Sequence, residues 1–216
     1  MQLDRAQALR YLGYGAAAPD ARTDALLDEC ERELKTLSTA RTVHRVYSDV
    51  YITEESSTIG GVIFRSRDLA GTLAGCSRAV ILCATLGSQA DRMRLRCGQT
   101  DLSKAAVMDA AQSACIEQIC DRFCERFRGS DEADGLSLTA RYSPGYGDFL
   151  ITDQPKLLAL ADATRRIGLT CSDSYMLLPQ KSVTAVIGLT AGEPRCGDRC
   201  SACENYATCR YRRQIG

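Results

Sequence analysis

The segment RYSPGYGD, residues 141–148, combines residue types that suit a ligand better than a hydrophobic core. Arg141 carries a planar fork of N–H donors that matches a carboxylate. Pro144 fixes the backbone, and Gly145 removes the side chain where a ligand must come close. The segment therefore predicts a rigid binding loop. The alternative is a glycine-rich turn whose arginine pairs with a neighbouring acid.

Two further residues of this segment add possible contacts. Ser143, together with Gly145, would offer main-chain groups to a ligand. Tyr146 has an aromatic face, and such a face attracts a positive charge. These residue types allow a ligand to come close to the backbone of residues 141–146.

A second group of reactive residues lies near the C-terminus. Four cysteines there have the spacing C-x3-C-x2-C-x5-C, and they are Cys196, Cys200, Cys203 and Cys209. Four thiolates this close can enclose a zinc ion or an iron–sulfur cluster. Zinc would stabilise the tail, whereas a cluster could admit electrons. The spacing does not distinguish the two, and a redox pair or reduced thiols are the alternatives.

The other eight of the twelve cysteines are scattered through apolar or helical contexts, in which free cysteine behaves as a small buried hydrophobe. They are Cys30, Cys76, Cys83, Cys97, Cys115, Cys120, Cys124 and Cys171. We expect them to lie in the core. His44 is the single histidine, and its strand-like surroundings predict a structural role, not a catalytic one.

Composition excludes two classes of function. The 216 residues contain 27 lysines and arginines against 27 aspartates and glutamates, so no overall field attracts nucleic acid or anionic lipid. No apolar run approaches the roughly 20 residues that cross a bilayer, and the first residues do not form a signal peptide. We expect a cytoplasmic protein that contacts neither nucleic acid nor a membrane.

The elements that must position the binding loop follow from hydrophobic periodicity. Helices are predicted over residues 4–14, 20–37, 66–75, 101–128 and 154–167, and one more begins at Ser88, where Ser88-x-x-Asp91 resembles a capping box. The 101–128 helix has an apolar stripe that consists of Val107, Ala111, Cys115, Ile119, Phe123 and Phe127. Strands are predicted over residues 42–52, with a kink, and over 136–140 and 182–189, with 78–87 as the central strand. These patterns favour an α+β fold over residues 1–190, followed by a cysteine-rich tail over residues 191–216.

Five segments together resemble one family. They are RYLGY (10–14), ATLG (84–87), MDAAQSACIEQICD (108–121), RYSPGYGD (141–148) and SDSYMLLPQKSVTAVIGL (172–189). The chain is similar, in these segments, to the activation (reactivation) domain of cobalamin-dependent methionine synthase, in the form that occurs as a short free-standing protein. The resemblance implies a twisted, mainly antiparallel sheet with packed helices.

The resemblance also implies a function. In the multidomain synthase, cob(I)alamin is occasionally oxidised to inactive cob(II)alamin. The activation domain binds S-adenosylmethionine and caps the cobalamin, reduced flavodoxin delivers an electron, and a methyl group from S-adenosylmethionine yields methylcobalamin. This chain has no room for the other modules, so the expected partner is a separate methionine synthase or related corrinoid protein, with a flavodoxin-like electron donor.

By the same resemblance, Arg141 would bind the carboxylate of the methionine moiety, and Ser143 and Gly145 would offer main-chain groups. Tyr146 would lie against the adenine or the sulfonium. Glu117 would receive the amino group, with a solvated helix-face glutamate as the alternative. The competing function is a metal-carrying or iron–sulfur electron-transfer protein that keeps the fold without binding S-adenosylmethionine.

Overall fold

A computed structural model of the chain describes residues 3–15, 17–36 and 39–192. Its largest sheet has four antiparallel strands in the order β1 (Arg41–Tyr47), β5 (Arg78–Thr85), β9 (Ser182–Thr190) and β6 (Ser137–Leu138). The two inner strands are the most apolar, because helices cover both faces of the sheet. The expected α+β fold with a mainly antiparallel sheet is confirmed, and so is the central place of residues 78–87.

Successive residues of β5 serve two separate cores, because side chains alternate between the faces of a strand. Val80, Leu82 and Ala84 belong to one cluster of buried residues. Ala79 and Ile81 belong to the other. This one strand therefore joins the two halves of the hydrophobic core.

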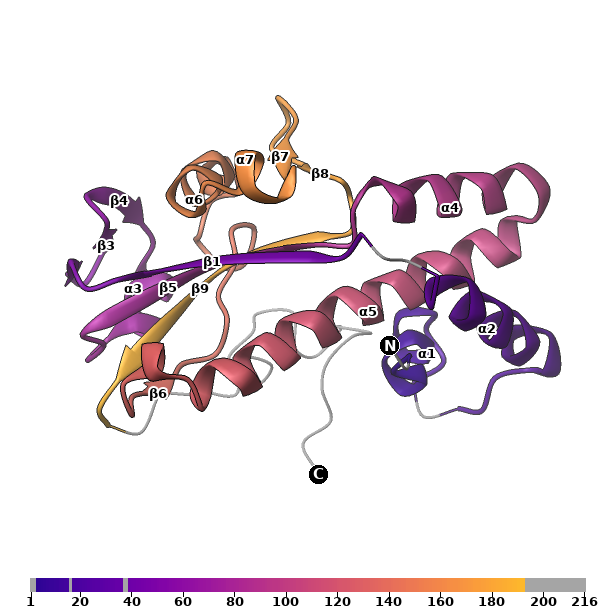
Figure 1. The fold of residues 1–216 in the computed structure, drawn as a ribbon, viewed down its shortest axis with the longest axis horizontal. Coiled ribbons are helices and arrows are strands. Elements are labelled where there is room, and N and C mark those ends of the chain that lie inside the picture. The colour runs from indigo at the N-terminus through magenta and orange to yellow at the C-terminus, as the bar shows by residue number, and fades with distance from the viewer. Residues whose placement is uncertain (1–2, 16, 37–38, 193–216) are drawn as a thin grey trace.

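Four helices pack around the first core. They are α1 (Arg5–Tyr11), α2 (Ala21–Leu34), α4 (Ser88–Thr100) and α5 (Leu102–Arg128). Figure 1 shows α5 running along one face of the sheet, with α1 and α2 beside it. The apolar stripe predicted along α5 is buried at every position except Ile119, which is partly buried.

The second core lies on the opposite face, which α6 (Gln154–Ala161) and α7 (Ala163–Ile167) cover (Figure 1). Helix α3 (Arg67–Leu73) also contributes to this core. The smaller elements are β2 (Val50–Ile52), β3 (Ser56–Ile59) and β4 (Val62–Arg65) in one sheet, β7 (Thr170–Cys171) and β8 (Leu177–Leu178) in another, and the 3-10 turns η1 (Asp131–Ala133) and η2 (Ile151–Asp153).

Two predicted elements are interrupted in the structure. The kinked strand expected over 42–52 is two separate strands in different sheets, since β1 pairs with β5 and β2 pairs with β3. The helix expected over 154–167 breaks at Asp162, whose φ of 52° is left-handed and ends α6. Both errors arise because apolar periodicity continues across a change of backbone direction.

Two local predictions also need correction. The capping box at Ser88 is absent: Gly87 precedes α4 without a side-chain cap, and Asp91 instead accepts a hydrogen bond from the Gln180 backbone N–H at 3.1 Å. The strand expected over 136–140 shortens to the two residues of β6, because the chain leaves the regular ladder there.

The prediction that the scattered cysteines lie in the core is confirmed for all but one of them. Seven of the eight cysteines are buried and Cys171 is partly buried. Burial raises the pKa of the Cys83 thiol to about 12, so this thiol stays protonated. His44 lies with Nε2 3.1 Å from Glu132 Oε2 and packs on the rings of Phe123 and Phe127.

Within the described ranges, no helix is both long enough and apolar enough to cross a membrane.

Candidate functional site

The predicted binding loop continues the edge of the main sheet. Tyr142 forms a bridge with Val186 of β9, in which each backbone N–H donates to the other residue's carbonyl, at 2.9 and 2.8 Å. The segment between β6 and α6 passes from the α5 side of the sheet to the α6 side (Figure 1). Arg141 therefore lies beside α5, whereas Asp148 lies beside α3.

The tip of the loop is a compact turn with an exposed surface. The Tyr146 N–H donates to the Ser143 carbonyl at 3.3 Å, and the Gly145 N–H donates to the Phe149 carbonyl at 2.7 Å. Pro144 is buried beneath the turn, and Gly145 has a left-handed φ of 94°. Tyr146 is 67% exposed. The turn thus presents an aromatic ring and bare backbone to solvent.

At the start of the loop, Arg141 binds two carboxylates of α5. Its Nη2 donates to Glu117 Oε2 and its Nη1 donates to Asp121 Oδ1, each at 2.7 Å. The Arg141 side chain is 17% exposed, against 30% for Glu117 and 49% for Asp121. We call these three residues the carboxylate–arginine cluster. Its formal charge is −1, and its carboxylates are more exposed than its guanidinium.

Opposing effects act on the pKa of Arg141. Burial disfavours its positive charge and lowers the pKa, but the hydrogen bond that Arg141 donates to Asp121 and the negative charge nearby outweigh burial and raise the pKa. The guanidinium is therefore always charged, and the cluster keeps its ionic character at neutral pH.

Sequence reasoning named Arg141 and Glu117 but missed Asp121. Glu117 and Asp121 are four residues apart on α5, so their side chains lie on one face of that helix. Their four-residue separation could have identified Asp121 from the sequence once Glu117 was a candidate. The structure has the pairing that the alternative prediction of a glycine-rich turn expected, in which Arg141 binds a neighbouring acid. The same pairing places Glu117 beside the start of the loop.

At the other end of the loop, Asp148 caps α3. Its carboxylate accepts hydrogen bonds from the Ser66 hydroxyl, from the Arg67 N–H at 2.7 Å and from the Asp68 N–H at 3.2 Å. In return, the Asp148 N–H donates to Asp68 Oδ2 at 3.2 Å. Partial burial works to raise the pKa of Asp148, but these hydrogen bonds outweigh it and the pKa is lowered. Asp148 thus fixes the position of the loop.

Gly147 is required by this close packing. Its φ is 52°, and a Cβ placed on it would lie 1.9 Å from Asp68 Oδ2 and 2.6 Å from the Tyr142 hydroxyl. A side chain there would force the ends of the Asp68 and Tyr142 side chains to move, in addition to the strain of the left-handed backbone. The glycine therefore serves the attachment of the loop to α3, in contrast to Gly145, where a Cβ would meet only Ile151 at 3.4 Å.

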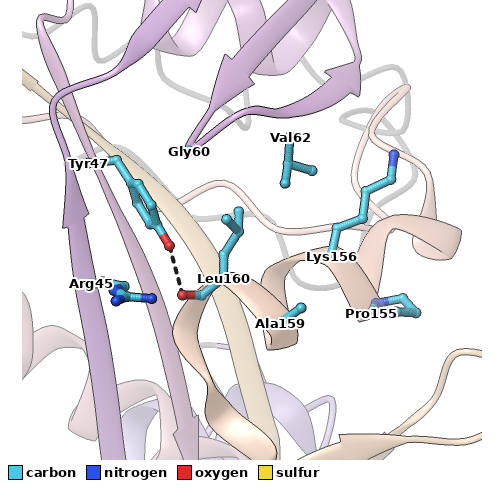
Figure 2. Close-up of a pocket in the computed structure, with 8 residues that line it drawn as sticks. All are labelled: Arg45, Tyr47, Gly60, Val62, Pro155, Lys156, Ala159 and Leu160. Atoms are coloured by element: carbon cyan, nitrogen blue, oxygen red, sulfur yellow. Dashed lines mark hydrogen bonds between the residues drawn. The ribbon is translucent and has the colours of Figure 1, made fainter.

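A surface depression of about 740 Å³ lies beside β1 and α6 (Figure 2). Two of its polar side chains are already paired within the protein. The Tyr47 hydroxyl donates to the Leu160 carbonyl at 2.8 Å, and Lys156 pairs with Asp153 at 2.7 Å. The depression is open and offers few groups that converge on a ligand, so we place the candidate site at the loop.

The predicted metal site cannot be located. Cys196, Cys200, Cys203 and Cys209 lie outside the described residues. Among the residues that the structure does describe, no group of three or more histidine, cysteine, aspartate or glutamate side chains is placed to hold a metal ion. Zinc or iron–sulfur binding by the tail stays a prediction from spacing.

Comparison with known proteins identifies the fold. No protein-family model and no curated protein sequence matches the chain. Among solved structures, the chain is similar to one described as "Crystal Structure of the MetH Reactivation Domain bound to AdoHcy", with a TM-score of 0.66 and 15% sequence identity. The match covers 89% of this chain and 75% of the other. The chain therefore has the fold of a MetH reactivation domain.

Proposed function

We propose that this chain is an accessory protein for the reductive remethylation of a corrinoid protein, and that it binds S-adenosylmethionine at residues 141–146. The observation that carries the proposal is the fold, shared over 89% of the chain with a reactivation domain bound to AdoHcy, the demethylated form of S-adenosylmethionine. Its partner would be a cobalamin-dependent methionine synthase or a related corrinoid protein, met in trans, with a flavodoxin-like electron donor.

The loop supports the proposal through what it leaves exposed. Gly145 and Tyr146 face solvent at the tip, so main-chain groups and one aromatic ring are accessible to a nucleoside or a sulfonium. The Tyr142 bridge and the Asp148 cap hold the two ends of the loop in place. A loop held in this way loses little conformational entropy when it binds a ligand.

The carboxylate–arginine cluster suits the amino-acid end of the ligand. Arg141 Nη1 donates to Asp121 and to Cys124 Sγ at 3.8 Å, whereas Nη2 donates one of its two hydrogens to Glu117. The second hydrogen of Nη2 is left for the ligand's carboxylate. Glu117 is half-buried and accepts from Arg141 through Oε2, so its second oxygen would accept from the ligand's amino group. These assignments give each end of the zwitterion an opposite charge.

The chain itself need not supply an acid, a base or a nucleophile. When bound on the partner, reduced cobalamin supplies the nucleophile that takes the methyl group. The residues of this chain would bind and orient the methyl donor and exclude water around it. His44 is hydrogen-bonded to Glu132 and the Cys83 thiol is buried, so the proposal gives neither residue a role in the methyl transfer.

Calorimetry with S-adenosylmethionine tests the binding step. Wild-type protein should bind the ligand, and Arg141→Ala should weaken binding at least about tenfold because a charge-assisted hydrogen bond is lost. Arg165→Ala is the matched control, since Arg165 pairs with Asp162 on the exposed surface of α7. Equal affinities for wild type and both variants would contradict the assigned site.

A reconstitution assay tests the function. Oxidised methionine synthase that lacks its own activation domain is mixed with an electron donor and S-adenosylmethionine, with or without this chain, and the visible spectrum follows conversion of cob(II)alamin to methylcobalamin. We expect conversion to depend on the chain and to be slower with Arg141→Ala. Conversion that is unchanged by the chain would contradict the proposal for this partner.

A further inference from the structure

Strand β1 forms one edge of the main sheet and is open to pairing with a further strand. Among the residues that the structure describes, β1 pairs with β5 alone, and β6 lies at the opposite edge. β1 is a regular strand of seven residues, whereas β6 has only two. A long edge strand presents unpaired N–H and C=O groups, which are a template for pairing with another chain. The β1 edge therefore has the backbone of a docking site.

The cations of β1 lie on the side of the sheet that α6 and α7 cover. Val43 and Tyr47 of β1 pack in the second core. Because side chains alternate along a strand, Arg41 and Arg45 lie on this same face, and both are exposed. Within the described ranges, neither guanidinium forms a hydrogen bond or an ion pair. Both charges are therefore available to a partner.

The surroundings of these two cations are positive overall. A hydrogen bond from Arg165 lowers the pKa of Asp162, and the nearby charge of Arg45 lowers it further. Asp162 is already paired with Arg165 at 2.5 Å, as Asp153 is with Lys156 at 2.7 Å. The charged residues on this face of β1 and in α6, α7 and their N-caps are Arg41, Arg45, Lys156, Arg165 and Arg166 against Asp153 and Asp162. These five positive and two negative charges leave +3, which attracts an acidic segment.

The depression beside β1 and α6 adds an apolar contact on the same face. Figure 2 shows Arg45 and Tyr47 on one side of it and α6 on the other. Val62, Ala159 and Leu160 contribute apolar side chains to its lining. An extended segment paired with β1 would place every second side chain on this face. An apolar side chain of such a segment would enter the open depression, while an acidic side chain two residues away would reach Arg45.

From this geometry we infer that β1 is a docking edge for an extended acidic segment of a partner protein, which adds to the main sheet as a further strand. Backbone hydrogen bonds would supply affinity, and Arg41, Arg45 and the depression would supply specificity. Two copies of this chain paired through β1 would bring like charges together, which disfavours a second copy as the occupant. The inference is independent of S-adenosylmethionine binding, because Tyr142 bridges to β9 on the side of the sheet away from β1.

Titration of the full chain with two peptides, followed by NMR at low salt, tests the inference. The acidic probe is acetyl-Glu-Thr-Phe-Thr-Glu-Thr-amide, and the basic probe has lysine in place of each glutamate. The acidic probe should bind at least about tenfold more tightly and should shift the amide signals of residues 41–47. Equal affinity for the two probes, or binding of neither, would overturn the inference and leave the proposed function untouched.

A charge reversal shows whether Arg45 selects the acidic probe. Arg45→Glu should lower the preference for the acidic probe at least about tenfold, because attraction is replaced by repulsion. Arg96→Glu is the matched control, since Arg96 is exposed on α4, and it should keep the wild-type preference. A preference that both variants change equally would mean that only the overall charge matters, and would overturn the docking edge.

A modified probe tests the strand pairing itself. The acidic peptide methylated on every backbone nitrogen keeps its charges but has no N–H groups to donate. It should bind at least about tenfold more weakly, because several backbone hydrogen bonds are lost. Unchanged affinity would show charge attraction without strand addition. Wild-type dimers in which the outward-facing β1 amides are protected from hydrogen exchange would assign the edge to a second copy and would also overturn the inference.

Discussion

The two ends of the binding loop both use aspartate or glutamate, but in opposite ways. At Asp148 the carboxylate accepts from three donors of α3 and its neighbour Ser66, although the residue is exposed. At Arg141 two carboxylates share one guanidinium and remain partly exposed. The Asp148 end therefore holds the loop in place, whereas under the proposed function the Arg141 end would offer its charged groups to a ligand.

Gly147→Ala, at the Asp148 end of the loop, is expected to cause the largest loss of stability. The added methyl group would overlap Asp68 and force a left-handed alanine, so we expect a loss of about 3 kcal/mol in the free energy of unfolding and weaker ligand binding. Urea denaturation measures the loss. Gly135→Ala is the matched control, since Gly135 has a φ of 69° and no atom within 4 Å, and it should lose only about 1 kcal/mol.

Equal losses for these two glycine variants would show that Gly147 provides only backbone freedom. The attachment of the loop to α3 would then not depend on close packing.

Arg141→Ala should separate binding from stability. We expect binding of S-adenosylmethionine to fall at least about tenfold, whereas the free energy of unfolding falls by only about 1 kcal/mol, because the ion pairs are partly exposed. Calorimetry and urea denaturation of the same sample measure the two quantities. A large stability loss with unchanged binding would reverse the roles given to the two ends.

Asp148→Asn should have a smaller effect that depends on pH. At pH 7 we expect a loss of about 1 kcal/mol, since a charged acceptor at the start of α3 is replaced by a neutral one. The pKa of Asp148 is lowered in the folded protein, so its contribution is complete above the pKa of the unfolded state, about 4. The contribution is lost as the pH falls through the lower folded-state pKa.

The stability difference between wild type and Asp148→Asn should thus stay constant between about pH 5 and pH 8 and shrink towards pH 3. Urea denaturation at both limits checks this. A difference that grows on acidification would contradict the role of the ionised cap.

Tyr142→Phe should have the smallest effect. The hydroxyl of Tyr142 donates to Asp68 Oδ2 and to the Tyr146 carbonyl, both at a long 3.3 Å, whereas the ring remains stacked on Phe149. We expect a loss of about 0.5 kcal/mol in the free energy of unfolding and little change in binding. A loss comparable to that of Gly147→Ala would mean that this hydroxyl, not the packing at Gly147, holds the loop.

The sequence predicted correctly those elements whose apolar pattern depends only on residues within the element. The apolar runs of β5 and β9 and the stripe of α5 need no knowledge of distant residues, and all three lie where they were predicted. The break at Asp162 escaped because left-handed backbone at an aspartate leaves no mark on hydrophobic periodicity.

For the candidate site, the loop residues could be named because they are contiguous. Their partners were harder to find. The hydroxyl of Tyr142 meets Asp68, which lies 74 residues earlier in the chain, and no spacing rule connects these two positions. Asp121 could have been found from its position relative to Glu117 on one helix.

The cysteine tail remains a prediction from spacing. Purification without oxygen, followed by a visible spectrum and by iron, sulfide and zinc analysis, checks it. Replacement of Cys196, Cys200, Cys203 and Cys209 by serine should abolish any bound metal and leave the eight other cysteines in place. Metal retained by that variant would contradict the predicted site.

A crystal structure of the protein soaked with S-adenosylmethionine shows directly whether residues 141–146 bind this ligand. We expect the ligand's carboxylate at Arg141, its amino group at Glu117, and the nucleoside and sulfonium against Gly145 and Tyr146. A ligand bound elsewhere, or a loop that stays empty at saturating concentration, would contradict this expectation.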